Sequence, residues 1–267
     1  MKPYISALRV RFLNGLQYRA AALGGLATQF FWGVMAIFIY HAFYISGGQP
    51  QTLSFSQLVT YLWLKQAFLA VLMLYDWDYE LFDMITSGNI SYELCRPCNL
   101  YGLWYVKLLS KRLASCTLRF SPIIVVAFLL PAPYKLSLPY SPVSFILFTI
   151  TMLLGLLLLV AISVLIYISV FKTMSPVGSM AFIGMVGEFF SGMTIPIPLM
   201  PEWLQRICYV MPFRWTADLP LRIYSGSISV IEAVISMGVQ FIWIALLVGA
   251  GSVIMRRITR HVVVQGG

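Results

Sequence analysis

The sequence predicts an all-α integral membrane protein with six transmembrane helices. Of its 267 residues, 60% are hydrophobic and only 10% are charged, and the mean hydropathy is +0.86. A soluble domain of this length is far less apolar. Soluble proteins also divide their apolar residues into runs shorter than the roughly 18 to 20 residues that cross a bilayer. Several runs here reach that length, and lysine and arginine are distributed as a single orientation in the membrane requires.

Proline, glycine and charged residues divide the apolar sequence into six predicted spans. The spans cover residues 22–45, 57–75, 108–130, 143–171, 177–195 and 230–255. With their flanking segments they predict a single transmembrane domain over residues 1–267.

Residues 3–20 predict a basic amphipathic helix ahead of the first span. Apolar residues recur in it at helical spacing, while Arg9 and Arg11 lie largely on other faces. Such a helix can lie in the membrane interface with its arginines toward anionic headgroups. The alternative, an ordinary soluble surface helix, fits a less apolar protein better.

The basic residues predict which ends of the spans lie in the cytoplasm. With the N-terminus inside, the basic residues that fall on or near the cytoplasmic side are Lys2, Arg9, Arg11, Arg19, Arg96, Lys107, Lys111, Arg112, Arg119, Lys172, Arg256, Arg257 and Arg260. Those that fall outside are Lys135, Arg206, Arg214 and Arg222. This asymmetry satisfies the positive-inside rule. Six spans then return the C-terminus to the cytoplasm, so we expect a multi-pass protein of a bacterial plasma (inner) membrane with both termini cytoplasmic.

The chain shows no catalytic or metal-binding motif. No phosphate-binding loop, zinc-protease motif or nucleophile elbow occurs, and His41 and His261 are the only histidines. Cys95 and Cys98 have the spacing of redox and zinc motifs but lack a second cysteine pair. We expect these cysteines on the buried side of a cytoplasmic helix, and we predict no catalytic residue, metal or cofactor in this chain.

Lys65 lies near the middle of the second predicted span, roughly 12 Å along the helix from its outer end. At that depth an ammonium group needs a polar cavity or a charged partner. Tyr61, one turn away, shares its face. Glu188 is the only carboxylate well inside another predicted span. Lys65 and Glu188 therefore either line a substrate pathway with Tyr61 or form a structural pair, and both interpretations stay open.

An acidic and aromatic cluster follows the second span. It consists of Asp76, Trp77, Asp78, Tyr79, Glu80 and Asp83. Its four carboxylates raise the possibility of a metal site. A solvated or partner-facing helix end is the preferred interpretation. Acidic residues on the cytoplasmic side do not conflict with the predicted topology, because carboxylates have little influence on membrane orientation.

Two stretches resemble ABC-2 type exporter permeases. Residues 85–97 contain Ile-x-Ser-Gly, ending at Gly88, followed by Leu-x-Arg-Pro, ending at Pro97. Residues 211–215 read Met-Pro-Phe-Arg-Trp, with Pro220 and Gly226 after them. The order of parts over essentially the whole chain is also similar to that family. It comprises an interfacial helix, six spans, a cytoplasmic helix between spans two and three, and a proline-broken segment before span six.

The resemblance implies two functional regions. Residues 80–98 would form a cytoplasmic coupling helix that docks on an ATPase subunit. The residues assigned to this contact are Gly88, Glu93, Leu94, Arg96 and Pro97. Residues 196–229 would form an extracellular re-entrant and gate region. The residues assigned to the gate are Pro196, Pro198, Pro212, Phe213 and Arg214.

The resemblance also implies the function of a permease subunit in an ATP-driven exporter. Such a subunit moves a hydrophobic or amphipathic substrate, such as a drug, lipid, glycolipid or peptide, out of the cytoplasm by alternating access. ATP and Mg²⁺ would bind to two separate ATPase subunits. The other partners would be membrane lipids and a second permease subunit, identical or paralogous, and no nucleic acid. The alternative is an ion-coupled secondary transporter that uses Lys65 and Glu188 as its coupling charges.

Overall fold

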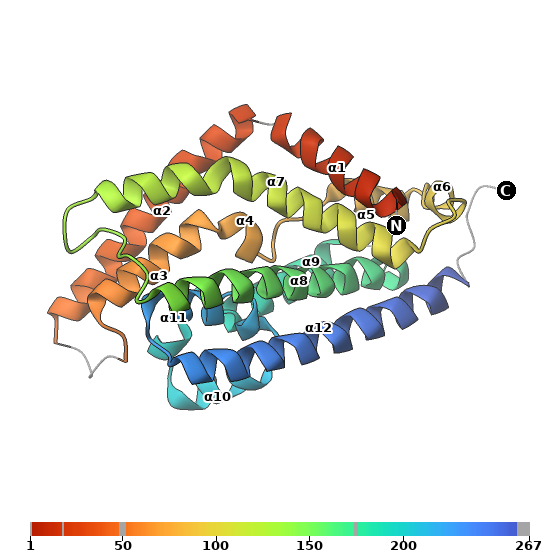
Figure 1. The fold of residues 1–267 in the computed structure, drawn as a ribbon. Coiled ribbons are helices and arrows are strands. Elements are labelled where there is room, and N and C mark those ends of the chain that lie inside the picture. Colours follow the sequence, from red (N-terminus) through yellow and green to blue (C-terminus); the bar gives the residue numbers. More distant parts are fainter. Residues whose placement is uncertain (1, 18, 48–51, 174–175, 261–267) are drawn as a thin grey trace.

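The computed structural model describes residues 2–17, 19–47, 52–173 and 176–260, and over these residues it contains helices and no strands. His41 belongs to this part of the chain, whereas His261 lies outside it. Figure 1 shows the long helices running side by side through one elongated body. The expected all-helical class is therefore confirmed for the described residues.

The helices follow one another in this order. The first half of the chain contains α1 (Lys2–Gln17), α2 (Arg19–Ile45), α3 (Phe55–Ala67), α4 (Leu69–Leu72), α5 (Tyr79–Thr86), α6 (Ser91–Leu94) and α7 (Leu100–Leu129). The second half contains α8 (Pro142–Thr173), α9 (Pro176–Phe190), the 3-10 helix η1 (Ile197–Leu199), α10 (Glu202–Val210), the 3-10 helix η2 (Phe213–Trp215), α11 (Asp218–Ser225) and α12 (Val230–Thr259).

Four described helices are long and apolar enough to cross a membrane. They are the Gly24–Ile45 part of α2 and the whole of α7, α8 and α12. The apolar part of α9, Met180–Phe190, is shorter. The predicted spans at 57–75 and 177–195 therefore correspond to shorter helices followed by non-helical segments.

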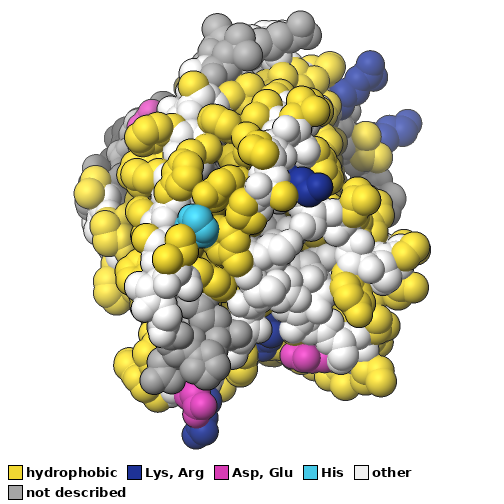
Figure 2. Space-filling view, turned by 90° about the vertical axis from the view of Figure 1, so that its left-hand side faces the viewer, with side chains coloured by type: hydrophobic (Ala, Val, Ile, Leu, Met, Phe, Trp, Pro, Cys, Tyr) yellow, Lys and Arg dark blue, Asp and Glu magenta, His cyan; other side chains and the backbone are white. Residues whose placement is uncertain are grey.

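α8 lies at the centre of the bundle and contacts α7, α9, α11 and α12. Its sequence is apolar on every face, and most of its side chains are buried. A helix without a polar face is stable where other helices surround it. Figure 2, a view onto the end of the molecule where α2 and α3 meet, shows how densely hydrophobic side chains also cover the outer surface.

The second predicted span is broken between α3 and α4. Phe68 is both the C-cap of α3 and the N-cap of α4. α4 is a single turn whose C-cap is Met73. Arg112 of α7, only 1% exposed, donates hydrogen bonds to the carbonyl oxygens of Ala70 (3.4 Å) and Met73 (2.6 Å) and to Ser163 Oγ (3.3 Å). A cation at the C-terminal end of a helix satisfies carbonyl groups that the helix cannot. Arg112 is therefore buried inside the bundle rather than exposed at its cytoplasmic edge.

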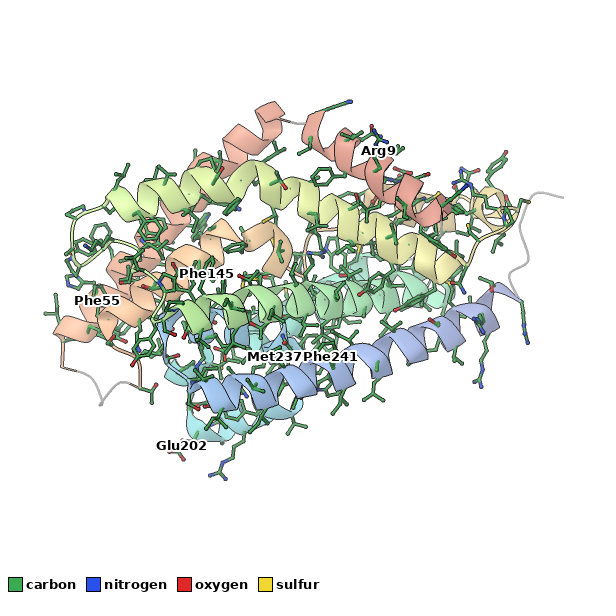
Figure 3. All side chains as sticks on the ribbon, in the orientation of Figure 1. Arg9, Phe55, Phe145, Glu202, Met237 and Phe241 are labelled. Atoms are coloured by element: carbon green, nitrogen blue, oxygen red, sulfur yellow. The ribbon has the colours of Figure 1, made fainter. Side chains whose placement is uncertain are left out.

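α1 packs along the first half of α7. Ser110 Oγ donates to the carbonyl oxygen of Leu8 (2.7 Å), and the Asn99 amide donates to the Tyr4 hydroxyl (2.9 Å). A Cβ at Gly15 would lie 2.6 Å from the Cβ of Ala114, so glycine is needed for this close approach. Figure 3 shows Arg9 on the outer side of α1, where it is exposed.

Candidate functional site

The predicted coupling segment, residues 80–98, lies at one end of the molecule. Figure 1 shows α5 and α6 beside the start of α7 and the N-terminal end of α1. The Asp78 side chain caps α5 by accepting from the Glu80 amide (3.1 Å). Gly88 has a φ of 78° and reverses the chain between α5 and α6. The left-handed backbone explains the glycine of the Ile-x-Ser-Gly motif.

The Glu93 carboxylate holds α6 against α7. It is only 4% exposed, accepts from Trp104 Nε1 (2.7 Å) and forms an ion pair with Lys107. We expected Glu93 to contact the ATPase directly, and this expectation is corrected. The carboxylate points into the protein because the two α7 side chains satisfy it there.

The acidic cluster after α4 is bound within the chain. Lys111 of α7 pairs with Asp76 (2.9 Å), and Arg11 of α1 pairs with Asp78 (3.6 Å) and Glu80. Asp76 and Asp78 are therefore paired within the chain, whereas Tyr79, Glu80 and Asp83 are exposed. Arg11, which we expected to face lipid headgroups, pairs with two of these carboxylates. In the described part of the chain, no group of three His, Cys, Asp or Glu side chains is placed to hold a metal ion.

A run of exposed side chains lies in and just after α6, in addition to exposed polar residues of α5 and of the turn that follows it. Tyr92 is 74% exposed, and Leu94, Arg96 and Pro97 are also exposed. Cys95 is exposed rather than buried, which corrects our expectation for that cysteine. This surface combines apolar groups with one cation and projects from the end of the bundle.

The predicted gate region folds back onto the bundle. Pro196 and Pro198 are buried around η1, and the carbonyl oxygen of Pro198 accepts from Thr52 Oγ1 (2.8 Å). Pro212 and Phe213 are half-buried. α11 packs on α8 and α3, so the irregular backbone of residues 196–229 is largely covered by protein.

Arg214 belongs to a buried group of four polar side chains, Tyr61, Arg214, Asp218 and Arg222, which we call the Asp218 cluster. The Asp218 carboxylate is fully buried. It accepts from the Tyr61 hydroxyl (3.4 Å) and Arg214 Nε (3.5 Å), and it lies 3.7 Å from Arg222. Burial raises the pKa of Asp218 above its ordinary value, and Arg222 and Arg214 oppose that rise.

Sequence reasoning did not identify Asp218 as a site residue. A signal was present, because positions 214, 218 and 222 are four residues apart and can share one helix face. Tyr61 also donates to the carbonyl oxygen of Gly192 (3.1 Å), just after α9. Tyr61 therefore ties α3 to the segment after α9 and to α11.

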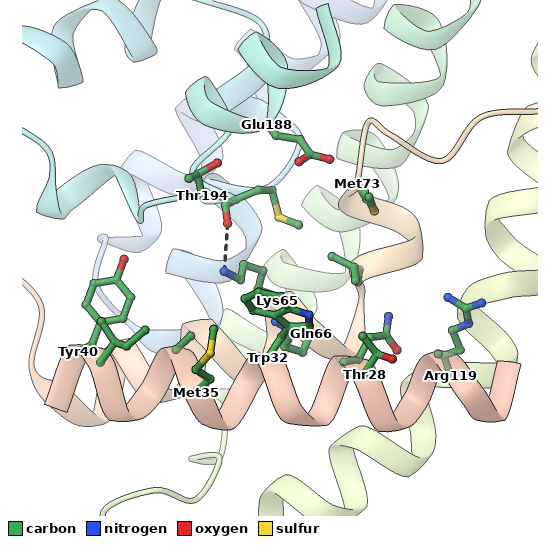
Figure 4. Close-up of a pocket in the computed structure, with 16 residues that line it drawn as sticks. Thr28, Trp32, Met35, Tyr40, Lys65, Gln66, Met73, Arg119, Glu188 and Thr194 are labelled. Atoms are coloured by element: carbon green, nitrogen blue, oxygen red, sulfur yellow. Dashed lines mark hydrogen bonds between the residues drawn. The ribbon is translucent and has the colours of Figure 1, made fainter. Parts of the chain in front are cut away.

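Lys65 and Glu188 line one cavity, which we call the polar cavity. It has a volume of about 630 Å³ and is lined by residues of α2, α3, α4, α7 and α9 and by the segment after α9. Lys65 Nζ donates to the carbonyl oxygen of Met193 (3.0 Å), as Figure 4 shows. Within the described residues no ion pair joins Lys65 to Glu188, and Glu188 Oε1 has no hydrogen-bond partner. Tyr61 belongs to the Asp218 cluster instead.

The cavity also contains polar residues that sequence reasoning missed. Gln29 of α2 and Arg119 of α7 line it together with Lys65. In Figure 4, Thr28 and Trp32 on α2 lie on one side of Lys65 and Glu188 on the other. Gln29 is the only Asn or Gln in α2, which was the available signal. The arrangement can bind a molecule that has both polar groups and apolar surface.

Comparison with known proteins identifies the family. A family model described as "ABC-2 family transporter protein" matches residues 30–266, which is most of the chain. No curated protein and no solved structure matches it. Permease subunits of this family lack catalytic domains, and the family implies ATPase partners. With its long apolar helices, the chain is a multi-pass membrane component of a transporter and belongs to the ABC-2 transporter family.

Proposed function

We propose that this chain is the permease subunit of an ATP-driven exporter that moves a hydrophobic or amphipathic substrate out of a bacterial cytoplasm. Membership of the ABC-2 family is the observation that carries the proposal. ATP and Mg²⁺ bind to two copies of a separate ATPase. A second permease subunit, identical or paralogous, completes the complex.

Six spans with cytoplasmic termini are the proposed topology. α3 with α4 forms the second span, and α9 with the segment after it forms the fifth. Arg256 and Arg257 in the last turn of α12 support a cytoplasmic end there. Residues 196–229 form the extracellular re-entrant region, since non-helical backbone is tolerated at membrane depth where protein covers it.

The coupling segment transmits ATPase closure to the polar cavity. The exposed side chains Leu94, Arg96 and Pro97 form the docking contact, and Glu93 positions α6 by binding α7. The chain between the docking contact and the polar cavity is short. α5 connects through residues 73–78 to α4, and α4 follows α3, the helix that carries Lys65. Arg112 and Lys111 hold this connection to α7, so a displacement of α5 moves the second span and α7 together.

The ion-coupled alternative has less support. It requires Lys65 and Glu188 to exchange or share a charge, whereas Lys65 is bound to the Met193 carbonyl. It also leaves the exposed surface of α6 without a role. The family membership favours ATP as the energy source.

The decisive experiment is co-expression with the ATPase encoded beside this chain, followed by purification and ATPase assay in reconstituted membranes. Arg96→Glu reverses the charge of the docking contact, and we expect it to abolish co-purification or reduce ATPase activity at least about tenfold, equivalent to roughly 1.4 kcal/mol. Arg206→Glu, an exposed arginine on α10, is the matched control and leaves both properties unchanged. If no ATPase associates and a proton or sodium gradient drives flux, the ion-coupled alternative replaces this proposal.

A further inference from the structure

The polar cavity contains a buried amide with no hydrogen-bond partner. Gln29 is only 4% exposed, and neither Nε2 nor Oε1 is bonded to another group of the protein. Its side chain nevertheless lines the cavity. Leaving a buried donor and acceptor unpaired destabilises a fold, so such groups usually have a partner. The position of Gln29 in the wall points to a ligand as that partner.

Other walls of the cavity offer further unpaired polar groups. Glu188 Oε1 on α9 and Arg119 Nε on α7 are buried without partners. Lys65 Nζ donates one hydrogen bond, to Met193, and an ammonium group has three hydrogens to donate. Residues with unpaired polar groups on α2, α7 and α9, and Lys65 on α3, therefore all lie in the walls of one cavity.

Much of the remaining lining is apolar and adaptable, beside the polar residues Thr28, Tyr40, Gln66 and Thr194. The apolar part includes Trp32, Met35, Ile39, Leu69, Met73 and Met193. Methionine side chains rearrange readily around ligands of different shape, and apolar walls with a few polar groups are typical of small-molecule sites. The occupant therefore has an apolar body as well as a polar group.

The charges of the cavity disfavour a cationic occupant. Lys65 and Glu188 carry opposite charges, which offset each other, and Arg119 leaves one positive charge in excess. A further positive charge is repelled more strongly beside Arg119 in this cavity than in bulk water, because the surrounding protein screens charges less well than water does. A neutral or anionic ligand meets no such repulsion.

We propose that the polar cavity binds an amphipathic molecule without positive charge, through a group that presents a hydrogen-bond donor and acceptor on the same edge, as a primary amide does. Gln29 is the specificity-determining residue, because a carboxamide pairs with another amide through one donated and one accepted bond. This inference rests on the proposed transport function only in taking the ligand to be the exported substrate. The binding site itself is independent of it.

The test measures binding to the full chain in lipid nanodiscs with three amphiphiles that share a brominated dodecyl chain. They are a fatty-acyl glycinamide, an alkyl acetate that lacks the donor, and an alkyl trimethylammonium cation. Bromine quenches tryptophan fluorescence, and Trp32 lines the cavity. The variants are Gln29→Leu, which keeps the size of the side chain, and Gln17→Leu, an exposed position at the end of α1, as the matched control.

We expect the unmodified chain and Gln17→Leu to bind the glycinamide about tenfold more tightly than the acetate, the effect of roughly one hydrogen-bonded pair. Gln29→Leu abolishes that difference and weakens glycinamide binding more than acetate binding, because the ester carbonyl loses only the bond donated by Gln29 Nε2. Equal binding of amide and acetate by the unmodified chain, an unchanged preference in Gln29→Leu, or tightest binding of the cation overturns the proposal.

The outcomes separate this inference from the proposed function. The binding assay contains no ATPase, so a preference that depends on Gln29 stands even if no ATPase associates with the chain. Conversely, normal coupling through Arg96 combined with no effect of Gln29→Leu leaves the exporter intact and removes only the amide site.

Discussion

Two groups of polar side chains lie one turn apart on α3 and differ in how completely they are paired. Tyr61 belongs to the Asp218 cluster, in which the central carboxylate contacts three neighbouring side chains. Lys65 faces the polar cavity, in which Gln29 and Glu188 Oε1 have no partner. Tyr61 of α3 thus joins an ion-paired group, in which Arg222 Nη1 is the one buried atom without a hydrogen bond within the described part of the chain. Lys65, one turn later, lies beside a cavity whose polar groups are paired to a smaller extent.

This difference distinguishes structural polar groups from ligand-binding ones. A buried network whose members satisfy one another holds elements in place and gains nothing from a ligand. A buried group without a partner is destabilising until something binds to it. The Asp218 cluster should therefore respond to mutation with a loss of stability, and the polar cavity with a change in binding.

Asp218→Ala is expected to have the largest effect. It leaves Arg214 and Arg222 without their shared carboxylate in a buried site, and breaking a buried ion pair in this way costs about 3–5 kcal/mol. The measurement is the thermal unfolding midpoint of the purified protein, together with its yield from the membrane. Asp218→Asn keeps a hydrogen-bond acceptor and should fall between Ala and the unmodified chain. An unfolding midpoint of the Ala variant within error of the unmodified one would show that the cluster is not structural.

Glu93→Gln extends the comparison to the paired group at the coupling end. Glutamine can still accept from Trp104, but Lys107 loses its charged partner in a buried site. We expect a loss of about 2 kcal/mol, as is typical for a hydrogen bond to a charged group. Stability is measured by thermal unfolding, and ATPase coupling in the reconstituted complex.

Glu80→Gln is the control for Glu93→Gln. Glu80 also pairs with a basic residue, Arg11, but its side chain is largely exposed. Exposed ion pairs contribute about 0–1 kcal/mol, so the two variants should differ clearly. Equal losses would mean that burial does not decide the strength of these pairs.

The fold could be predicted from the sequence where one local signal was sufficient. The continuous apolar runs of α7, α8 and α12 identified these helices directly. The end of α4 at Leu72 could not be predicted, because the carbonyl groups of Ala70 and Met73 there are bonded by Arg112, which lies 42 positions after Ala70 in the chain. The helix propensities of residues 57–75, the predicted second span, give no sign of such a contact.

The candidate site was predictable to a smaller extent. Its position in a predicted span singled out Lys65 as needing a polar environment, and the structure places Lys65 in the wall of a cavity with its Nζ bonded to the Met193 carbonyl. Motif resemblance placed Arg96 in a segment that the structure exposes. It could not show that Glu93 faces inward, since this orientation depends on Trp104 and Lys107 of another helix. Likewise, the sequence could not show that Gln29 is unpaired, because this depends on whether the surrounding helices place a donor or acceptor next to its amide.

Gln29→Leu should change stability in the opposite direction from the two carboxylate variants. Replacing an unpaired buried amide by an apolar side chain of similar size removes a desolvation penalty, so the ligand-free protein should become about 1 kcal/mol more stable. The measurement is thermal unfolding of the ligand-free protein. A loss of stability comparable with that of Glu93→Gln would show that Gln29 is bonded within the fold and belongs with the paired groups.

The smallest effect is expected in a double-mutant cycle between Lys65→Met and Glu188→Gln. No ion pair joins the two residues among the described parts of the chain, and Lys65 is bound to the Met193 carbonyl instead. Their coupling energy in the stability cycle should therefore be below about 0.5 kcal/mol, as for sites without a direct contact. A structural ion pair in a buried site would instead give a coupling of about 1–3 kcal/mol. Thermal unfolding of the four proteins gives this value. It decides between the two roles that the sequence leaves open for Lys65 and Glu188, because only groups that do not satisfy each other remain free to bind a ligand.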